Sequence, residues 1–90
     1  MPQAIVNPEE LRRFAQVLKR FNGDLRDSVT ALHAQLVGLG DTWRDQEHDR
    51  FRLEFEQTML VIERFLEASD QHVPFLLHKA QHIEEYLHQR

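Results

Sequence analysis

Residues 39–45 read Leu39-Gly40-Asp41-Thr42-Trp43-Arg44-Asp45, and they separate two long segments that both have helical apolar spacing. Neither apolar pattern continues through this stretch. Gly38 and Gly40 can end a helix in the left-handed conformation that a side chain disfavours, and Asp41, Thr42 and Asp45 are good N-caps for a following helix. The stretch therefore predicts a hairpin turn, in which Trp43, the only tryptophan, folds back and holds the two helices together.

The segment before the turn has the spacing of one amphipathic helix, from about residue 8 to 38. Asn7 can cap this helix and Pro8 suits its first position. Because the spacing passes through Asn22-Gly23-Asp24 in register, we keep this tripeptide inside the helix. The apolar stripe that is expected to face the second helix follows a three-four alternation through Leu11, Phe14, Leu18, Phe21, Leu25, Ser28, Leu32, Gln35 and Leu39.

The segment after the turn predicts a second, longer helix, from about residue 46 to 88. Pro74 lies inside it, and we expect a kink there, with a break as the alternative. At ~1.5 Å per residue the first helix is ~46 Å long and the second ~64 Å, so the part after about Lys79 is expected to lack a partner on the first helix. The stripe on this helix runs through Phe51, Phe55, Met59, Ile62, Leu66, Ser69, Val73, Leu76, Ala80, Ile83 and Leu87.

Both helices carry more apolar residues than one hairpin can cover. Two antiparallel helices touch along a single line, and a large exposed apolar patch is uncommon on a monomer. Pairing of two hairpins into a four-helix bundle removes the excess, and an identical copy is the simplest partner. The apolar residues off the main line are Ala15, Val17, Val29 and Leu36 on the first helix and Leu53, Leu60, Val61, Phe65, Phe75 and Leu77 on the second.

Length, composition and charge exclude several classes of protein. Ninety residues make a single small domain, and without cysteine its stability must come from packing. The net charge is −4, with five basic and four acidic groups in residues 1–40 but six and eleven in residues 41–90. This balance disfavours nucleic acid as a partner. No apolar run approaches the ~20 residues of a membrane span, and Met1 to Asn7 is too short for a secretory leader, so we expect a soluble cytosolic chain.

With the hairpin placed, the chain resembles the Trp-x-Gly family of small helical hairpin proteins associated with type VII secretion. Trp43-Arg44-Asp45 occupies the position of the family's turn motif, preceded by Gly40 and followed by an acidic helix start. The resemblance covers nearly the whole chain in length and layout. It implies a homo- or heterodimer, no cleaved leader, export without a signal peptide in those members that are exported, and a secretion component or larger effector as a further partner.

The chain departs from the family pattern at two places. Asp45 stands where the family has glycine, so the turn must either avoid positive φ or use Asp45 as an N-cap. The family's C-terminal export signal is a tyrosine followed four residues later by Asp or Glu. Here Tyr86 is followed four residues later by Arg90, so the resemblance supports the fold more strongly than it supports export.

A metal-binding helical bundle is the alternative that the composition raises. His78 and His82 have the i, i+4 spacing that places two imidazoles on one helical face, with His88 nearby. A di-iron bundle also needs Glu-x-x-His facing inward, and none lies on the predicted core line. His48 has no Ser or Cys nucleophile beside it. We therefore interpret the histidines and glutamates as solvated or interface-rim residues and predict no catalytic, cofactor or metal site.

The sequence therefore predicts an all-α antiparallel two-helix hairpin that pairs into a four-helix bundle dimer and acts as a non-enzymatic interaction module. The turn motif consists of Gly40, Trp43 and Asp45. The predicted surface for the second copy or a related helical protein consists of Phe14, Leu18, Phe21, Leu25, Phe55, Met59, Ile62 and Leu66.

Overall fold

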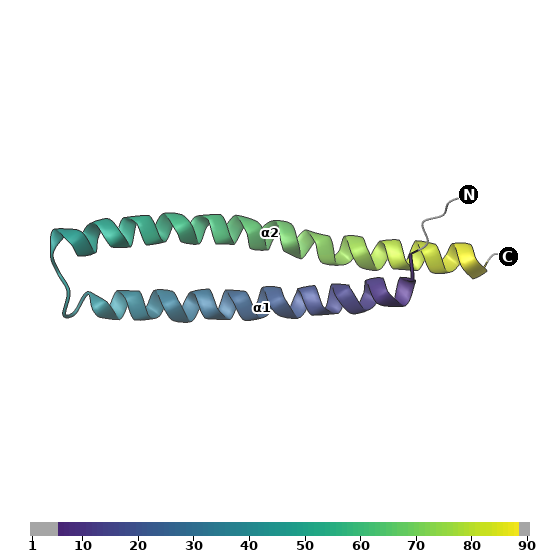
Figure 1. The fold of residues 1–90 in the computed structure, drawn as a ribbon, viewed down its shortest axis with the longest axis horizontal. Coiled ribbons are helices and arrows are strands. Elements are labelled where there is room, and N and C mark those ends of the chain that lie inside the picture. Colours follow the sequence, from purple (N-terminus) through teal and green to yellow (C-terminus); the bar gives the residue numbers. More distant parts are fainter. Residues whose placement is uncertain (1–5, 89–90) are drawn as a thin grey trace.

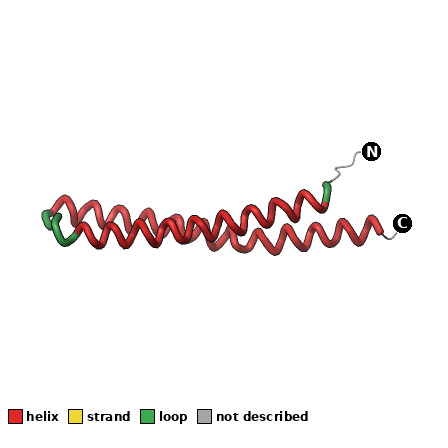
Figure 2. Tube along the Cα trace, turned by 90° about the horizontal axis from the view of Figure 1, so that it is seen from below, coloured by secondary structure: helices red, strands yellow, loops and turns green. Residues whose placement is uncertain are grey.

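The computed structural model describes residues 6–88 and shows an antiparallel helical hairpin, 69 × 21 × 15 Å in extent (Figure 1). The helices are α1, Pro8–Leu39, and α2, Gln46–His88, joined by a loop of six residues. A view turned by 90° shows the two helices crossing at a shallow angle along their length (Figure 2). Met1–Ile5 and Arg90, on which some of the sequence-based expectations fall, lie outside the described residues.

Both helices begin with the caps that their sequences provide. The side chain of Asn7 accepts hydrogen bonds from the backbone N–H groups of Glu9 and Glu10, and Pro8 occupies the first turn, where its missing N–H costs nothing. At α2, Asp45 Oδ1 accepts a hydrogen bond of 2.9 Å from the backbone N–H of His48. Each cap satisfies donors that a helix start would otherwise leave unpaired.

The glycines near the turn do not act as we expected from the sequence. No residue that the structure describes has a positive φ, Gly38 lies inside α1, and Gly40 has right-handed helical angles of φ −61° and ψ −16°. The prediction of a left-handed helix end is therefore wrong. Gly40 is instead at a close approach, because a Cβ there would lie 3.2 Å from the carbonyl oxygen of Val37 and 3.9 Å from His48 Cε1.

The contact between the helices follows small and polar residues as well as apolar ones. The buried side chains of α1 are Ala15, Asn22 and Leu36, and those of α2 are His48, Leu66, Ser69, Val73 and Ala80. On α2 this line agrees with the predicted stripe between Phe55 and Ile83. On α1 it does not, because Ala15 and Leu36 were placed off the contact line and Phe14, Phe21, Leu32 and Leu39 of the predicted stripe are exposed.

The C-terminal part of α2 has a partner on α1, contrary to the expectation for residues after Lys79. Ala80 is fully buried, and both oxygens of Glu84 accept hydrogen bonds from Arg12 near the start of α1. The pairing is shifted because α2 begins beyond the end of α1, so that Leu39 lies beside Phe51 and not beside Asp45. Figure 1 shows that only the last turns of α2 extend past the start of α1.

Helix α2 continues through Pro74 as one helix, so the alternative of a break is wrong. A proline has no N–H to donate, and the carbonyl of Asp70, four residues earlier, therefore loses its usual helical donor. This missing backbone hydrogen bond at Asp70 lies next to the buried Ser69, where α2 contacts α1 through side-chain hydrogen bonds.

Candidate interaction surface

One side of the hairpin is an exposed apolar surface, which we call the apolar face: Phe14, Phe21, Leu32 and Leu39 of α1 with Phe51, Phe65 and Leu87 of α2. On α1 these residues are spaced by 7, 11 and 7 positions, and on α2 by 14 and 22, all close to whole numbers of helical turns. Each set therefore shares one face of its helix. Both sets lie on the same side of the hairpin, because Leu32 and Leu39 line one groove together with Phe51.

That groove, the turn-end groove, is a hollow of about 310 Å³ between the end of α1 and the start of α2. Its lining is almost entirely apolar: Leu32, Gln35, Leu36, Leu39, Phe51 and Phe55. The aromatic rings of Phe51 and Phe55 lie with their centroids 5.7 Å apart. A groove of this composition at one end of an apolar face is suited to an apolar side chain of a partner.

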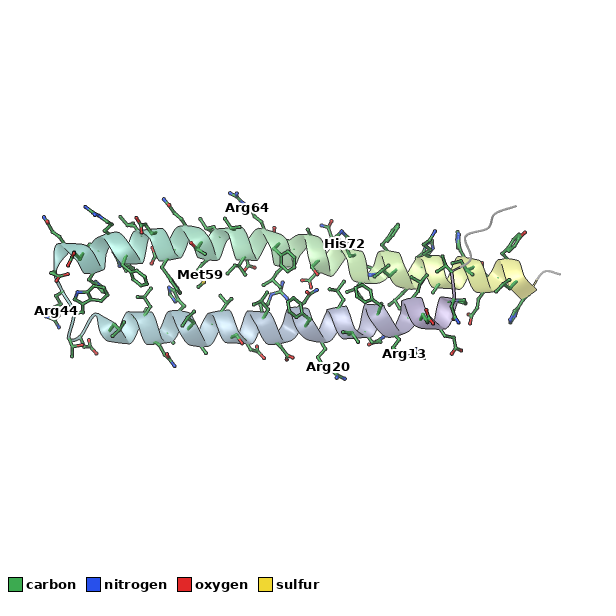
Figure 3. The ribbon with its side chains drawn as sticks, viewed as in Figure 1. Arg13, Arg20, Arg44, Met59, Arg64 and His72 are labelled. Carbon is green, nitrogen blue, oxygen red and sulfur yellow. The ribbon has the colours of Figure 1, made fainter. Side chains whose placement is uncertain are left out.

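The residues predicted from the sequence to bind a partner differ in exposure: some are exposed, some are half-buried and one is fully buried. Phe14 and Phe21 are exposed, with 49% of Phe21 accessible. Leu66 is fully buried within the hairpin, so it supports the surface from beneath and is not available for direct contact. Figure 3 shows Met59 between the helices. The half-buried members are Leu18, Leu25, Phe55, Met59 and Ile62.

The edge of the hairpin away from the apolar face is polar and carries two ion pairs that join the helices. Arg12 donates to both oxygens of Glu84, one at 2.9 Å, and Arg26 Nη2 donates to Asp70 Oδ2 at 2.7 Å. At about 100° per residue, Arg12 and Arg26 project well away from Phe14 and Phe21. Further charged groups also point outward, and Figure 3 shows Arg13, Arg20 and Arg64 directed away from the contact between the helices.

These ion pairs predict a loss of stability in acid. The hydrogen bond from Arg26 holds the pKa of Asp70 below its usual value, and that from Arg12 does the same for the pKa of Glu84. A carboxyl group with a lowered pKa in the folded state stabilises the fold above its unfolded pKa, and this contribution is lost as pH falls through the folded pKa. We expect urea midpoints to decrease as pH falls from about 4.5, the ordinary range of these groups.

The matched control for the acid prediction is the double variant Asp70→Asn, Glu84→Gln. It should be less stable than the wild type at neutral pH and should show a shallower decrease in urea midpoint below pH ~4.5, because the two linked groups are gone. Equal slopes in the two proteins would contradict this assignment.

A buried polar cluster lies at the middle of the hairpin. Asn22 is only 1% exposed; its Oδ1 accepts a hydrogen bond of 2.8 Å from Ser69 Oγ, and its Nδ2 donates to Asp70 Oδ1 at 3.1 Å. Every partner is supplied by the opposite helix. A buried amide without partners costs free energy, so sliding one helix along the other would be penalised here. The cluster therefore fixes the register of the two helices.

The turn motif closes the other end of the hairpin. The backbone N–H of Trp43 donates to the carbonyl of Leu39 at 2.8 Å, and Arg44 Nε donates to the carbonyl of Gly40 at 2.9 Å. The half-buried indole of Trp43 lies edge-on to His48, with ring centroids 4.9 Å apart, and 6.1 Å from Phe51. Both aromatic partners belong to α2, so Trp43 holds the loop against the start of that helix.

His48, in the first turn of α2, is the buried residue at this end of the hairpin that the sequence did not reveal. It is 7% exposed, and its Nε2 is buried without a hydrogen-bond partner. The sequence placed it among acidic residues at a helix start, where a solvated side chain is the usual outcome. Its spacing of seven residues from Phe55 and eighteen from Leu66, both close to whole numbers of turns, is the signal that places it on the buried line.

The histidine pair and the carboxylates do not assemble a metal site in the described part of the chain. His78 and His82 are exposed, with ring centroids 4.7 Å apart. Within residues 6–88, no group of three or more His, Asp or Glu side chains is placed to hold a metal ion. None of the helices in the described part of the chain combines the length and the apolar character that a membrane crossing needs.

Comparison with known proteins agrees with this architecture. Residues 3–86 match the WXG100 family, described as proteins of 100 residues with WXG. Crystal structures of the secreted protein EsxB from Bacillus anthracis share the fold. A selenomethionine-labelled form has a TM-score of 0.80 at 22% identity, covering 96% of this chain and 98% of that one. The wild-type form has a TM-score of 0.79 at 23% identity, covering 93% and 97%. The comparison with curated proteins gave no match.

Proposed function

This chain belongs to the WXG100 family, whose members are non-enzymatic, and from that premise we propose that it is a type VII secretion substrate or adaptor that acts as a dimer through its apolar face. The observation that carries the proposal is the position of the exposed aromatic and aliphatic residues. Seven of them form the apolar face on one side of the hairpin, to which both helices contribute, and the ion pairs lie along the other edge. The resemblance to EsxB, a secreted protein, supports the secretion part.

The dimer is a prediction about energy as well as geometry. Burying a large apolar side chain contributes about 1.5–3 kcal/mol. In a two-fold dimer each residue of the apolar face is buried once in each copy, so its contribution counts two times. The partner is a second copy or a related helical hairpin with a similar apolar face. Sedimentation equilibrium at micromolar concentration tests the first case directly, and a well-folded monomer would contradict it.

Phe21→Asp is expected to weaken the dimer without unfolding the hairpin. Phe21 is half exposed in the single chain, so the hairpin loses little packing, whereas the dimer loses two phenylalanines and gains two desolvated carboxylates. A loss of about 3 kcal/mol raises the dissociation constant at least about 100-fold. Sedimentation equilibrium measures this change, and circular dichroism verifies the helices.

Phe75→Asp is the matched control for the dimer. Phe75 is equally apolar and 63% exposed, but it lies on the back of α2, away from α1. The same chemical change there should leave the dissociation constant nearly unchanged. If the two substitutions raised the dissociation constant equally, the association would be non-specific hydrophobic contact and would not depend on the apolar face.

Export is tested in the cell that makes the protein. The chain should appear in the medium when the type VII secretion system is intact and stay in the cells when that system is inactivated, with a cytosolic enzyme as the lysis control. Retention of the protein in both strains would remove the secretion part of the proposal and leave the interaction module.

A further inference from the structure

We infer that the side of α2 opposite α1 is a second interaction surface, which docks an acidic amphipathic helix of another protein. This surface, which we call the back stripe, goes beyond the proposed dimer because it shares no residue with the apolar face. The back stripe consists of Val61, Arg64, Ala68, Phe75, His78, Lys79 and His82.

The direction of the back stripe follows from the buried line of α2. Leu66 and Val73 are buried against α1, and at ~100° per residue Phe75 projects ~160–180° away from each of them. Every residue of the stripe is exposed, and Figure 3 shows Arg64 pointing away from α1. The hairpin itself therefore leaves this surface open to a partner.

The spacing of the stripe favours a single helix as the partner. Val61, Ala68, Phe75 and His82 follow one another at intervals of seven residues. A seven-residue repeat drifts by ~20° per heptad on a straight helix, so it forms a narrow seam that fits one second helix in a left-handed coiled coil. Val61 is 62% exposed and Phe75 is 63% exposed, so both have apolar surface to bury against that helix.

The charges of α2 are sorted around this seam. Between residues 57 and 86 the basic side chains are Arg64, His72, His78, Lys79 and His82, and the carboxylates are Glu63, Glu67, Asp70, Glu84 and Glu85. At ~100° per residue, each basic side chain lies within ~60° of the direction of Phe75, and each carboxylate lies ~80° or more from it. The back stripe is therefore a basic surface on an acidic helix.

The two permanent cations of the stripe are placed to receive carboxylates. Arg64 and Lys79 lie on opposite sides of the seven-residue seam, each ~50° from it, and ~22 Å apart along the helix. Neither forms an ion pair within residues 6–88, where Asp70 and Glu84 are paired with the arginines of α1. A helix with glutamates on both sides of its own apolar seam matches these positions, as in coiled coils whose flanking charges select the partner.

A lipid surface fits the back stripe less well. A helix that lies on a membrane needs a broad apolar face, because the interface covers one whole side of it. Here Arg64 and Gln71 project in nearly the same direction as Phe75, so a flat apolar surface would desolvate them. A single partner helix covers only the seam and leaves both groups in contact with water or with its carboxylates.

A synthetic helical peptide is the probe for this surface. It has about 28 residues, with leucine at every seventh position, glutamate on both sides of the leucines and alanine elsewhere. We expect the full chain to bind the labelled peptide with a micromolar dissociation constant at low salt, measured by fluorescence anisotropy, and at least about fivefold more weakly at about 0.5 M salt. A control peptide with glutamine in place of each glutamate should bind at least about tenfold more weakly than the acidic one.

Substitutions in the stripe should weaken this binding. Phe75→Asp, and separately the double variant Arg64→Glu, Lys79→Glu, should each raise the dissociation constant of the acidic peptide at least about tenfold. Arg52→Glu is the matched control. It reverses the charge of another exposed arginine of α2, but one that projects ~140° away from Phe75, so the dissociation constant should be nearly unchanged. Circular dichroism verifies the helices of each variant.

The outcomes separate this inference from the proposed dimer. Phe21→Asp should weaken the dimer and keep the affinity for the acidic peptide. A wild-type monomer that binds the peptide through the stripe would overturn the dimer and leave this inference standing.

Three results would overturn the inference while the dimer stands. The first is equal binding of the glutamate and glutamine peptides, or an acidic peptide whose binding neither stripe variant weakens. The second is binding to vesicles that contain phosphatidylserine without binding to the peptide, which would make the stripe a lipid-binding surface. The third is association of wild-type dimers into larger assemblies that Arg64→Glu abolishes, since the occupant would then be another copy of this chain.

Discussion

Leu66→Ala is expected to lower the free energy of unfolding by about 3 kcal/mol, the middle of the range for truncating a buried leucine. Leu66 has 0% exposure and is the largest fully buried side chain of the hairpin. It lies beside Ser69, where the polar cluster joins the helices, so the surroundings cannot collapse into the cavity without disturbing those hydrogen bonds. For a domain of this size the loss corresponds to a decrease in melting temperature of about 12–24 °C.

Leu60→Ala is the matched control for this prediction. The same two residue types are exchanged six positions earlier on the same helix, but Leu60 is 58% exposed. We expect a change within about 0.5 kcal/mol. Both variants are measured by urea unfolding at the same protein concentration, because dimerisation makes stability depend on concentration. Equal destabilisation by the two substitutions would mean that Leu60 is covered by a partner.

The two helices and their N-terminal caps followed from local chemistry, which is why the sequence was informative about them. Asn7 and Asp45 each accept a backbone hydrogen bond at a helix start, and these contacts need only residues within one turn. The departure of Asp45 from the family's glycine also has a local explanation. Because no described residue of the turn uses a positive φ, a glycine is not required there, and the Asp45 side chain supplies the cap for α2.

The contact line on α1 was mispredicted for a physical reason. Apolar spacing shows the average direction of all apolar residues on a helix, and on α1 these residues serve two surfaces, the contact with α2 and the apolar face. The stripe through Phe14 and Phe21 is displaced from the true contact line toward the apolar face. The contact itself runs along Ala15 and Asn22, where a small residue and a paired amide allow close approach of the helices.

The buried polar residues could not be placed from the sequence, because their partners are distant along the chain. Asn22 and Ser69 are 47 residues apart, and the amide next to Gly23 and Asp24 has the composition of a turn. Only the assembled hairpin shows that their hydrogen-bonding groups match. The turn-end groove is likewise a product of two helix ends, and no single segment predicts it.

The axial offset of the two helices also could not be predicted from either helix alone, because it depends on the loop that joins them. A simple reflection about Trp43 pairs residue 8, at the start of α1, with residue 78 and leaves α2 bare after about Lys79. The six-residue loop instead allows α2 to start beyond α1, which brings Glu84 within reach of Arg12. The length of the bare end therefore depends on loop geometry, which the apolar spacing of the two helices does not report.

Trp43→Ala is expected to lower the free energy of unfolding by about 2 kcal/mol, less than the 3–5 kcal/mol for a fully buried aromatic. The half-buried indole loses part of its apolar burial, together with aromatic pairs to His48 and Phe51 that are worth about 0.5–1.5 kcal/mol each. One effect acts in the opposite direction. Removing the ring admits water to His48 Nε2, which has no partner in the fold, and relieves part of the cost of that unpaired atom.

The conservative variant separates the role of the ring from that of the backbone turn. Trp43→Phe keeps an aromatic edge against His48 and should recover about half of the loss, since the backbone hydrogen bond from residue 43 to Leu39 is common to all three proteins. Stability is followed by far-ultraviolet circular dichroism, because both variants remove the only tryptophan. A melting temperature unchanged by Trp43→Ala, with weaker capture of a secretion component, would instead make Trp43 a recognition residue and not an anchor of the turn.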